Sequence, residues 1–235
     1  MTTLFLTSGP SFYKDGKHGL ISDRVNNKDL IVELKRELKG YSNIVFVCSN
    51  PDDYETTEMY ASLITKSLSL SGIKFDMGDI IDSRNWLFSK SLITNADLVV
   101  LMGGDTLTQM QFFNDIELSD KLKKCKGIIL GISAGSVNMA KNAYCSKDKY
   151  NETTYYKGLS LTSLNIEPHF DTNDKKRIKE VLIEDSKKQP FVALDDDSFI
   201  IVKGNTGKIF GNAYYFKDGD YKKIHNLNEV ELQGW

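Results

Sequence analysis

Residues 127–138 read GIILGISAGSVN, and this stretch decides the fold class. Gly127–Ile132 is a short apolar run, which is typical of a buried parallel strand. The Gly-Ile-Ser-Ala-Gly sequence that closes the run predicts a tight turn, with a helix beginning directly after Ser133. A strand that leads through a turn into a helix is the repeating unit of a parallel sheet covered by helices.

The rest of the chain repeats this alternation. We predict strands over Thr3–Thr7, Asn43–Cys48, Ile73–Met77 and Ala96–Met102, helices over Lys28–Lys39 and Glu58–Leu70, and a polar loop over Ser8–Asn26. Further along, we predict a helix over Asp174–Lys187 and strands over Phe191–Leu194, Phe199–Val202 and Lys208–Phe210. The turn Gly204-Asn205-Thr206-Gly207 makes the last two strands a hairpin.

These elements predict a single α/β domain over residues 1–235. Its mostly parallel central sheet carries helices on both faces and ends in a C-terminal β-hairpin. No internal repeat, low-complexity tract or linker divides the chain.

Composition excludes several classes of function. With 30 Lys and Arg against 32 Asp and Glu, a net charge of −2 and a pI near 6.0, the chain has no basic excess for a nucleic-acid partner. Its three cysteines, Cys48, Cys125 and Cys145, are scattered and form no CxxC pair. We therefore expect reduced, mostly buried thiols and no metal site.

The N-terminus has no basic start, and no segment approaches the roughly 18 apolar residues of a membrane span. We expect a soluble, cytoplasmic protein without a membrane partner. We also expect a monomer or homodimer that needs no cofactor.

The G-x-S-x-G sequence at Gly131–Gly135 has the strand–turn–helix context of a nucleophile elbow. A serine on such a turn exposes its hydroxyl, and the flanking glycines relieve the crowding that the turn creates. The N–H of Ala134, at the helix start, would point into the site. The structural alternative is that Ser133 only caps the helix.

A serine nucleophile needs a base, and histidine is the usual one. His18 and His225 lie in polar surroundings and are expected to be exposed, whereas His169 ends the apolar stretch LNIEPHF. Spacing alone does not bring His169 to Ser133, because an isolated histidine is more often structural. An orienting carboxylate would come from Asp195-Asp196-Asp197, directly after a predicted core strand. Because side chains alternate between the two faces of an extended strand, Asp195 and Asp197 should lie on one side and Asp196 on the other. This alternation leaves open which side faces the site.

Four motifs in order, GGDT, GISAGSVNMA, EPHF and LDDDS, resemble those of the peptidase E (aspartyl dipeptidase) and cyanophycinase family of serine peptidases. The resemblance covers roughly Leu98–Val202. It implies a class I glutamine amidotransferase-like (flavodoxin-like) fold.

The resemblance also implies functional roles for named residues. Ser133 would be the nucleophile, His169 its base and Asp196 the third member of the triad. The N–H groups of Gly104 and Ala134 would form the oxyanion hole, and Asp105 and Arg177 are the matching candidates for substrate binding.

The leading hypothesis is a serine-type peptidase that hydrolyses small peptides, including dipeptides, through a Ser-His-Asp triad and an acyl-enzyme. Acidic residues around the predicted site (Glu167, Asp171, Asp174 and Asp195–Asp197) favour peptides with a free amino terminus. One alternative is an α/β-hydrolase esterase that uses Ser133, Asp195 or Asp196, and His225. The other is a non-catalytic relative of the fold that binds a small molecule.

Overall fold

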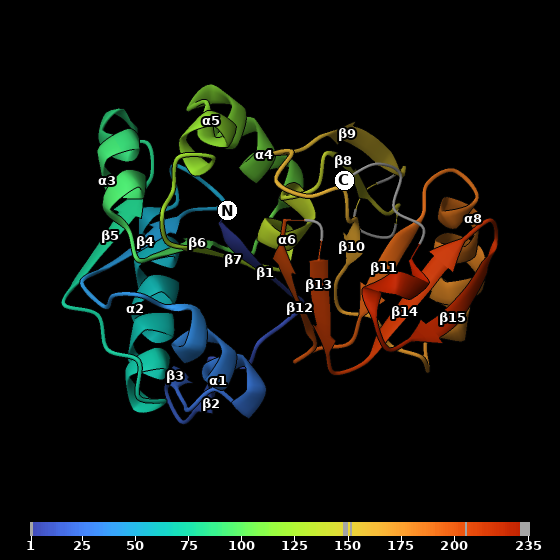
Figure 1. Cartoon of the computed structure of the whole chain (residues 1–235), viewed down its shortest axis with the longest axis horizontal. Helices are drawn as coiled ribbons and strands as arrows, with labels where there is room; N and C mark the ends of the chain where they lie inside the picture. The colour runs from blue at the N-terminus through green and yellow to red at the C-terminus, as the bar shows by residue number, and fades with distance from the viewer. Residues whose placement is uncertain (1, 148–149, 151, 205, 231–235) are drawn as a thin grey trace.

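The centre of the molecule is a seven-stranded, mostly parallel sheet, seen in a computed structural model that describes residues 2–147, 150, 152–204 and 206–230 (Figure 1). Its strands are β1 (Thr3–Thr7), β4 (Asn43–Val47), β5 (Met77–Ile81), β6 (Leu98–Leu101), β7 (Ile128–Ile132), β12 (Phe199–Lys203) and β13 (Thr206–Phe210). Across the sheet the order is β13-β12-β1-β7-β6-β4-β5. Five of these strands run parallel to one another, namely β1, β7, β6, β4 and β5, whereas β12 and β13 run antiparallel to their neighbours.

Helices cover both faces of this sheet because strand side chains alternate between them. On one face, Phe5 of β1 joins a buried cluster with α1 (Lys28–Glu37) and α2 (Tyr54–Leu70). On the other face, Leu4 and Leu6 join a cluster with α3 (Ser89–Asn95), α4 (Thr106–Asp115) and α5 (Leu118–Leu122). A short 3-10 turn, η1 (Trp86–Phe88), leads into α3.

A second, four-stranded sheet lies beside the first, at the right of Figure 1. It is built from β10 (Ile166–Glu167), β11 (Phe191–Leu194), β14 (Ala213–Lys217) and β15 (Asp220–Ile224), in that order. One face contributes Val192 and Tyr215 to the same buried cluster as the large sheet. The other face packs Phe191 and Phe216 against a helical segment made of α7 (Lys175–Arg177), the π turn η2 (Ile178–Leu182) and α8 (Ile183–Ser186).

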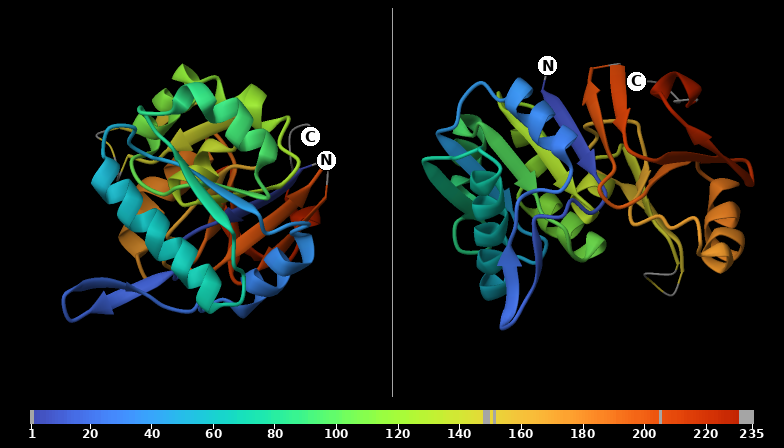
Figure 2. Two further views of the ribbon diagram at one scale, coloured as in Figure 1. Left: turned by 90° about the vertical axis from the view of Figure 1, so that its left-hand side faces the viewer. Right: turned by 90° about the horizontal axis from the view of Figure 1, so that it is seen from below.

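The remaining elements are short. The hairpin β2 (Tyr13–Gly16) and β3 (Gly19–Ser22) projects from the body of the molecule beside α2, as both views of Figure 2 show. A second hairpin joins β8 (Asn142–Cys145) and β9 (Thr154–Lys157). The chain also forms α6 (Ala134–Asn138) and the 3-10 turn η3 (Leu227–Glu229).

Some predicted elements are wrong in position. The pattern Ile73–Met77 predicts a strand, but β5 is Met77–Ile81. Ile73 and Phe75 are buried and Lys74 is exposed, so the alternation is real, yet these residues cover the end of α2, where the N–H of Ile73 donates to the carbonyl of Leu68. The true strand lies at the sheet edge, where its first residues are exposed and need no apolar side chains.

Other elements escape the sequence pattern. The polar loop Ser8–Asn26 contains the hairpin β2–β3, whose side chains are mostly exposed and so carry no apolar signal. The chain does not close at β13, because β14 and β15 follow it and complete the second sheet. In the predicted hairpin, β12 and β13 pair antiparallel with Lys203 opposite Thr206, while Asn205 lies outside the described residues.

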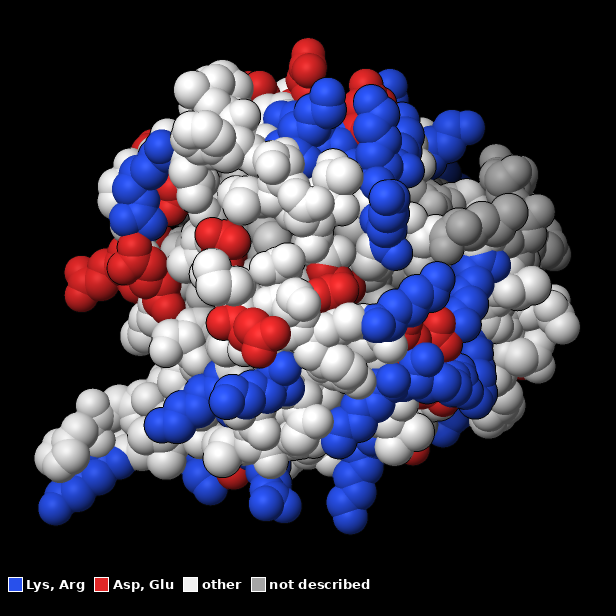
Figure 3. All heavy atoms as spheres, turned by 60° about the vertical axis from the view of Figure 1, so that its left-hand side comes forward, with Lys and Arg blue, Asp and Glu red and all other residues white. Residues whose placement is uncertain are grey.

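Charge is interspersed on the face shown in Figure 3, where Lys and Arg side chains lie beside Asp and Glu. Along the hairpin, for example, Lys14 pairs with Asp23 at 2.6 Å. Within the described residues, none of the helices combines the length and apolar character needed to cross a bilayer.

Candidate active site

Ser133 occupies a strained turn between β7 and α6. Its φ is 49° and its ψ is −108°, a backbone conformation that is costly for a residue with a side chain. Two hydrogen bonds hold it there, because the N–H of Ser133 donates to the carbonyls of Thr7 (3.1 Å) and Ser8 (3.0 Å) at the end of β1. The structure therefore gives the G-x-S-x-G segment the strand–turn–helix geometry that its sequence predicts.

Both glycines of this motif are required by close packing. A Cβ at Gly131 would lie 2.7 Å from the backbone nitrogen of Ser136, inside any real contact distance. A Cβ at Gly135 would overlap the carbonyl of Leu101 in β6. The small residues thus let α6 begin directly against the strands, so that Ser133 stands at the carboxyl edge of the sheet.

His169 reaches Ser133 from the second sheet. It follows β10 and also has a positive φ of 58°. The Ser133 Oγ lies 2.9 Å from His169 Nε2, and His169 Nδ1 lies 2.6 Å from Asp196 Oδ1. Because a carboxylate can only accept, the ring proton sits on Nδ1 and leaves Nε2 free to accept from the serine hydroxyl.

The three consecutive acids after β11 have three different partners. Asp196 faces His169, whereas Asp195 accepts from Asn212 Nδ2 at 2.9 Å. Asp197 accepts from the N–H and the hydroxyl of Ser11, both at 3.1 Å. The chain turns here, with Asp197 at a φ of 61°, so strand alternation does not describe these side chains. Burial raises the pKa of Asp195, which contacts no part of the serine–histidine pair.

Ser8 is a site residue that the sequence analysis missed. Its buried hydroxyl accepts from the N–H of His169 at 2.7 Å and donates to Asp196 Oδ1 at 3.3 Å. The next residue, Gly9, allows this approach, because a Cβ there would lie 2.5 Å from Asp196 Oδ1. The signal was its place at the end of β1, since the carboxyl ends of parallel strands gather at one edge.

The Gly103–Gly104 turn after β6 lies against Ser133. A Cβ on Gly103 would be 3.7 Å from the Cβ of Ser133, and one on Gly104, which has a φ of 148°, would overlap the side chain of Ser49. Within the described residues, the N–H groups of Gly104 and Ala134 have no hydrogen-bond acceptor. Both amides are therefore available to a ligand.

Asp105 and Arg177, the predicted substrate-binding residues, bind protein groups in this structure. Asp105 caps α4 through the N–H of Thr108 (2.7 Å) and accepts from the hydroxyl of Tyr150 (2.8 Å). Burial alone would raise the pKa of Asp105, but these hydrogen bonds outweigh it and lower the pKa. Arg177 pairs with buried Glu167 and reaches the carbonyl of His169 at 3.4 Å. Their roles toward substrate stay predictions.

Several of the acidic residues expected around the site bind protein groups, so fewer of them face the cavity than the sequence predicts. Glu167 is buried, is paired with Arg177 and accepts from Tyr144 at 2.8 Å. Asp171 and Asp174 bind groups in the turn and helix that follow His169. Of the acids in this region, Asp196 lines the cavity beside Ser133.

The other histidines and the cysteines stand apart from Ser133. His18, in the β2–β3 turn, and His225, after β15, are both exposed. All three cysteines are buried, as expected, and no disulfide joins them. Burial and the nearby Asp82 raise the pKa of Cys48 to about 12, so this thiol is not a competing nucleophile near neutral pH. No cluster suited to a metal ion occurs among the residues that the structure describes.

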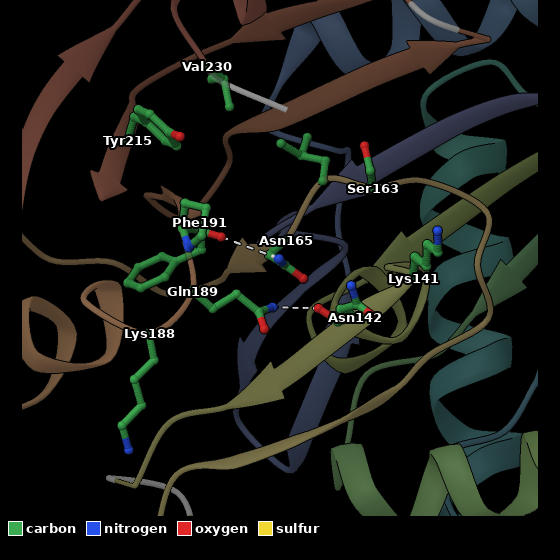
Figure 4. A pocket seen from close by; sticks show the side chains of 11 residues that line it. Lys141, Asn142, Ser163, Asn165, Lys188, Gln189, Phe191, Tyr215 and Val230 are labelled. Atoms are coloured by element: carbon green, nitrogen blue, oxygen red, sulfur yellow. Dashed lines mark hydrogen bonds between the residues drawn. The ribbon is translucent and has the colours of Figure 1, made fainter. Parts of the chain in front are cut away.

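A cavity of about 460 Å³ opens beside Ser133, His169 and Asp196. This volume is within the range of about 300–1,000 Å³ that small-molecule sites occupy. A second cavity, of about 220 Å³, lies away from them and is shown in Figure 4. It contains Ser163, but the described residues that line it include no histidine that could act as a base. The larger cavity is the candidate active site.

Comparison with known proteins gives a consistent result. Residues 18–210 match the model of Peptidase family S51. A protein from a Nostoc species, named Peptidase E, is 26% identical over 187 residues, which cover 72% of this chain and 73% of that protein.

Two solved structures show the same fold. One is a peptidase from an acI-B1 Actinobacterium, with a TM-score of 0.67, 12% identity and coverage of 96% of this chain and 95% of that one. The other is a protein from Listeria monocytogenes whose description names peptidase E, with a TM-score of 0.60, 18% identity and coverage of 95% and 99%.

Proposed function

The chain belongs to peptidase family S51, and we propose that Ser133, His169 and Asp196 are the catalytic triad of this serine peptidase. The observation that carries the proposal is the continuous hydrogen-bonded chain from Ser133 Oγ through the His169 ring to Asp196 Oδ1, with steps of 2.9 and 2.6 Å. These distances lie within the reach that a nucleophile and its base need.

The proposed reaction follows from the roles that these atoms can take. Ser133 Oγ attacks the peptide carbonyl while His169 Nε2 accepts its proton, and Asp196 stabilises the imidazolium that forms. The negative charge on the carbonyl oxygen is bound by the N–H groups of Gly104 and Ala134. His169 then protonates the leaving amine, the C–N bond breaks, and water hydrolyses the acyl-enzyme by the same steps.

We infer that the substrates are small peptides, including dipeptides. Support comes from the cavity of about 460 Å³, which holds a ligand of a few residues rather than a folded chain. The projecting hairpin β2–β3 forms part of its wall through Tyr13, so a larger substrate would meet this hairpin.

The strand order supports the finer fold assignment. Four of the five parallel strands, β4, β5, β6 and β7, lie across the sheet in the order 2-1-3-4 when they are numbered among themselves along the chain, as in flavodoxin-like sheets. We infer the class I glutamine amidotransferase-like type, with β1 taking the place of the fifth strand.

The experiment is active-site labelling with a fluorophosphonate, followed by mass spectrometry of the peptides. We expect one adduct, on Ser133, and we expect Ser133→Ala to abolish labelling and to lower turnover by at least about 10³-fold. Ser91→Ala, at an exposed position on α3, is the matched control and should label like the native protein. An adduct on another residue, or none on folded native protein, would refute the proposal.

A further inference from the structure

The cavity beside Ser133 is lined by segments that follow β1 and by segments that follow β6. In the sheet, β7 lies between β1 and β6. His169 is held at the β1 side through Ser8, whereas Gly103 and Gly104 lie at the β6 side. In the proposed reaction the leaving amine must face His169, so the acyl residue of the substrate takes the β6 side.

The walls on this side are apolar and aromatic. Met102 at the end of β6 and Ile64 of α2 are both buried, and Tyr60 lies one turn earlier on α2. Tyr13 of the hairpin also lines the cavity and packs against Tyr60, with the two ring centres 5.3 Å apart and the ring planes tilted by 50°. Two rings at this distance and tilt form a favourable aromatic contact and leave faces and edges for a third group.

Electrostatics decide what this pocket can hold. Among the described residues, the cavity lining contains no lysine or arginine, and its single carboxylate is that of Asp196. Moving a carboxylate or an ammonium group out of water without a partner of opposite charge is costly. Burial and the neighbouring Tyr60 raise the pKa of Tyr13, so its phenol stays neutral at physiological pH.

We propose that Tyr13 and Tyr60 set the specificity of this peptidase for substrates whose acyl residue carries a neutral apolar or aromatic side chain. The inference rests on the proposed function, because it takes Ser133 as the attacking group. It disfavours an acidic acyl residue, since no cation lines the described pocket to bind an acidic side chain.

The test uses five dipeptides with a free amino terminus, X-Leu, in which X is Phe, Leu, Ala, Asp or Lys, and measures released leucine. The concentration of competent enzyme is set by fluorophosphonate titration of Ser133. We expect kcat/KM for Phe-Leu to exceed that for Asp-Leu and Lys-Leu by at least about 10-fold, the scale of one well-placed pocket contact.

Substitutions of Tyr13 and Tyr60 then test whether these tyrosines cause the selectivity. Tyr60→Ala and Tyr13→Ala should each lower the ratio of kcat/KM for Phe-Leu over Ala-Leu by about 10-fold, while Tyr60→Phe keeps it. Tyr41→Ala is the matched control. Tyr41 also packs against an aromatic ring, that of Phe75, but it does not line the cavity, so its truncation should leave the ratio unchanged. A general structural defect would reduce the amount of folded enzyme and so lower kcat/KM for both dipeptides equally. The ratio of the two kcat/KM values is therefore unaffected by such a defect.

The outcomes separate this inference from the proposed function. Absent labelling of Ser133 overturns both. Normal labelling overturns the inference alone if Asp-Leu is cleaved as fast as Phe-Leu, or if both tyrosine-to-alanine variants keep the native ratio. Normal labelling without cleavage of any dipeptide overturns the inference and also the inference that dipeptides are substrates, while Ser133 remains the reactive serine.

Discussion

At the scale of single residues, the site is built from strained backbone. Ser133, His169 and Asp197 all have φ values between 49° and 61°, in the left-handed region that residues with side chains rarely adopt. Each strained residue is held by hydrogen bonds from other segments, including those of Ser8, Ser11 and Thr7. Strain that is fixed in this way keeps side chains oriented toward one another before a substrate arrives.

The first prediction concerns the base. His169→Ala should lower turnover of a dipeptide by at least about 10³-fold, because Ser133 then has no acceptor for its proton. His18→Ala and His225→Ala, at exposed positions, should retain most of the activity. Steady-state kinetics on the three variants decide the matter, and an inactive His225→Ala beside an active His169→Ala would restore the esterase alternative.

The second prediction concerns the acid. Asp196→Asn should lower turnover by about 10⁴-fold, because the amide no longer holds the imidazole in the tautomer with its proton on Nδ1. Asp195→Asn is the matched control, since Asp195 binds Asn212 and not His169. Thermal unfolding of both variants should stay near native. Equal loss of turnover in the two variants would argue against Asp196 as the third triad member.

At the scale of elements, an ion pair between Arg177 and Glu167 holds the segment that carries His169. Arg177, at the end of α7, bonds to Glu167 of β10 and reaches the carbonyl of His169. The side chains of Arg177 and Glu167 are only 14% and 3% exposed, so each neutralises a charge that is largely shielded from water. Such a pair orients the turn between β10 and α7 from the protein side.

The third prediction follows from this pair. Arg177→Met should lower the free energy of unfolding by about 3–5 kcal/mol, because it leaves the Glu167 carboxylate buried without its cation. Lys187→Met breaks the exposed pair with Glu184 and should cost only about 0–1 kcal/mol. Urea unfolding measures both. If Arg177→Met and Lys187→Met lower the free energy of unfolding equally, the buried pair does not support the segment. In that case, adding Glu167→Gln to Arg177→Met should restore no stability.

At the scale of the whole molecule, the site lies where two sheets meet. Ser133 and Gly104 follow strands of the large sheet, whereas His169 and Asp196 follow β10 and β11 of the second. One continuous buried cluster joins the two, since it includes Ile129 of β7 with Val192 and Leu194 of β11. The relative position of Ser133 and His169 therefore depends on packing between the sheets.

The fourth prediction tests whether activity requires the second sheet to be folded. Phe216 of β14 is fully buried and stacks on Phe191 of β11 with ring centres 5.0 Å apart. Phe216→Ala should cost about 3–5 kcal/mol of unfolding free energy, and activity should be lost in the same transition. Leu87→Ala, a truncation at a 73% exposed position, should change stability by less than about 0.5 kcal/mol. Activity that persists after the near-ultraviolet signal of the second sheet has melted would contradict the prediction.

The parts of the fold that local sequence specifies were predictable. The strand Thr3–Thr7 has the bounds expected of it, and the apolar runs that became β4, β6, β7 and β11 are buried strands. The region 73–81 was mislocated, because an edge strand needs fewer apolar residues than the buried turn before it. The second sheet was missed as a unit, because β14 pairs with β11 and not with β13, the strand just before it, and β15 then pairs with β14.

Local sequence is enough to specify the turn at Ser133. The glycines, the serine and the apolar run before them are contiguous, and short-range sterics give them one geometry. Which histidine contacts Ser133, and which aspartate contacts that histidine, depends on long-range packing. His169 is 36 residues from Ser133 and 27 residues from Asp196 along the chain. No local propensity encodes such a distance. It follows from the burial of two sheets against each other, which places Ser8 where it can bind both His169 and Asp196.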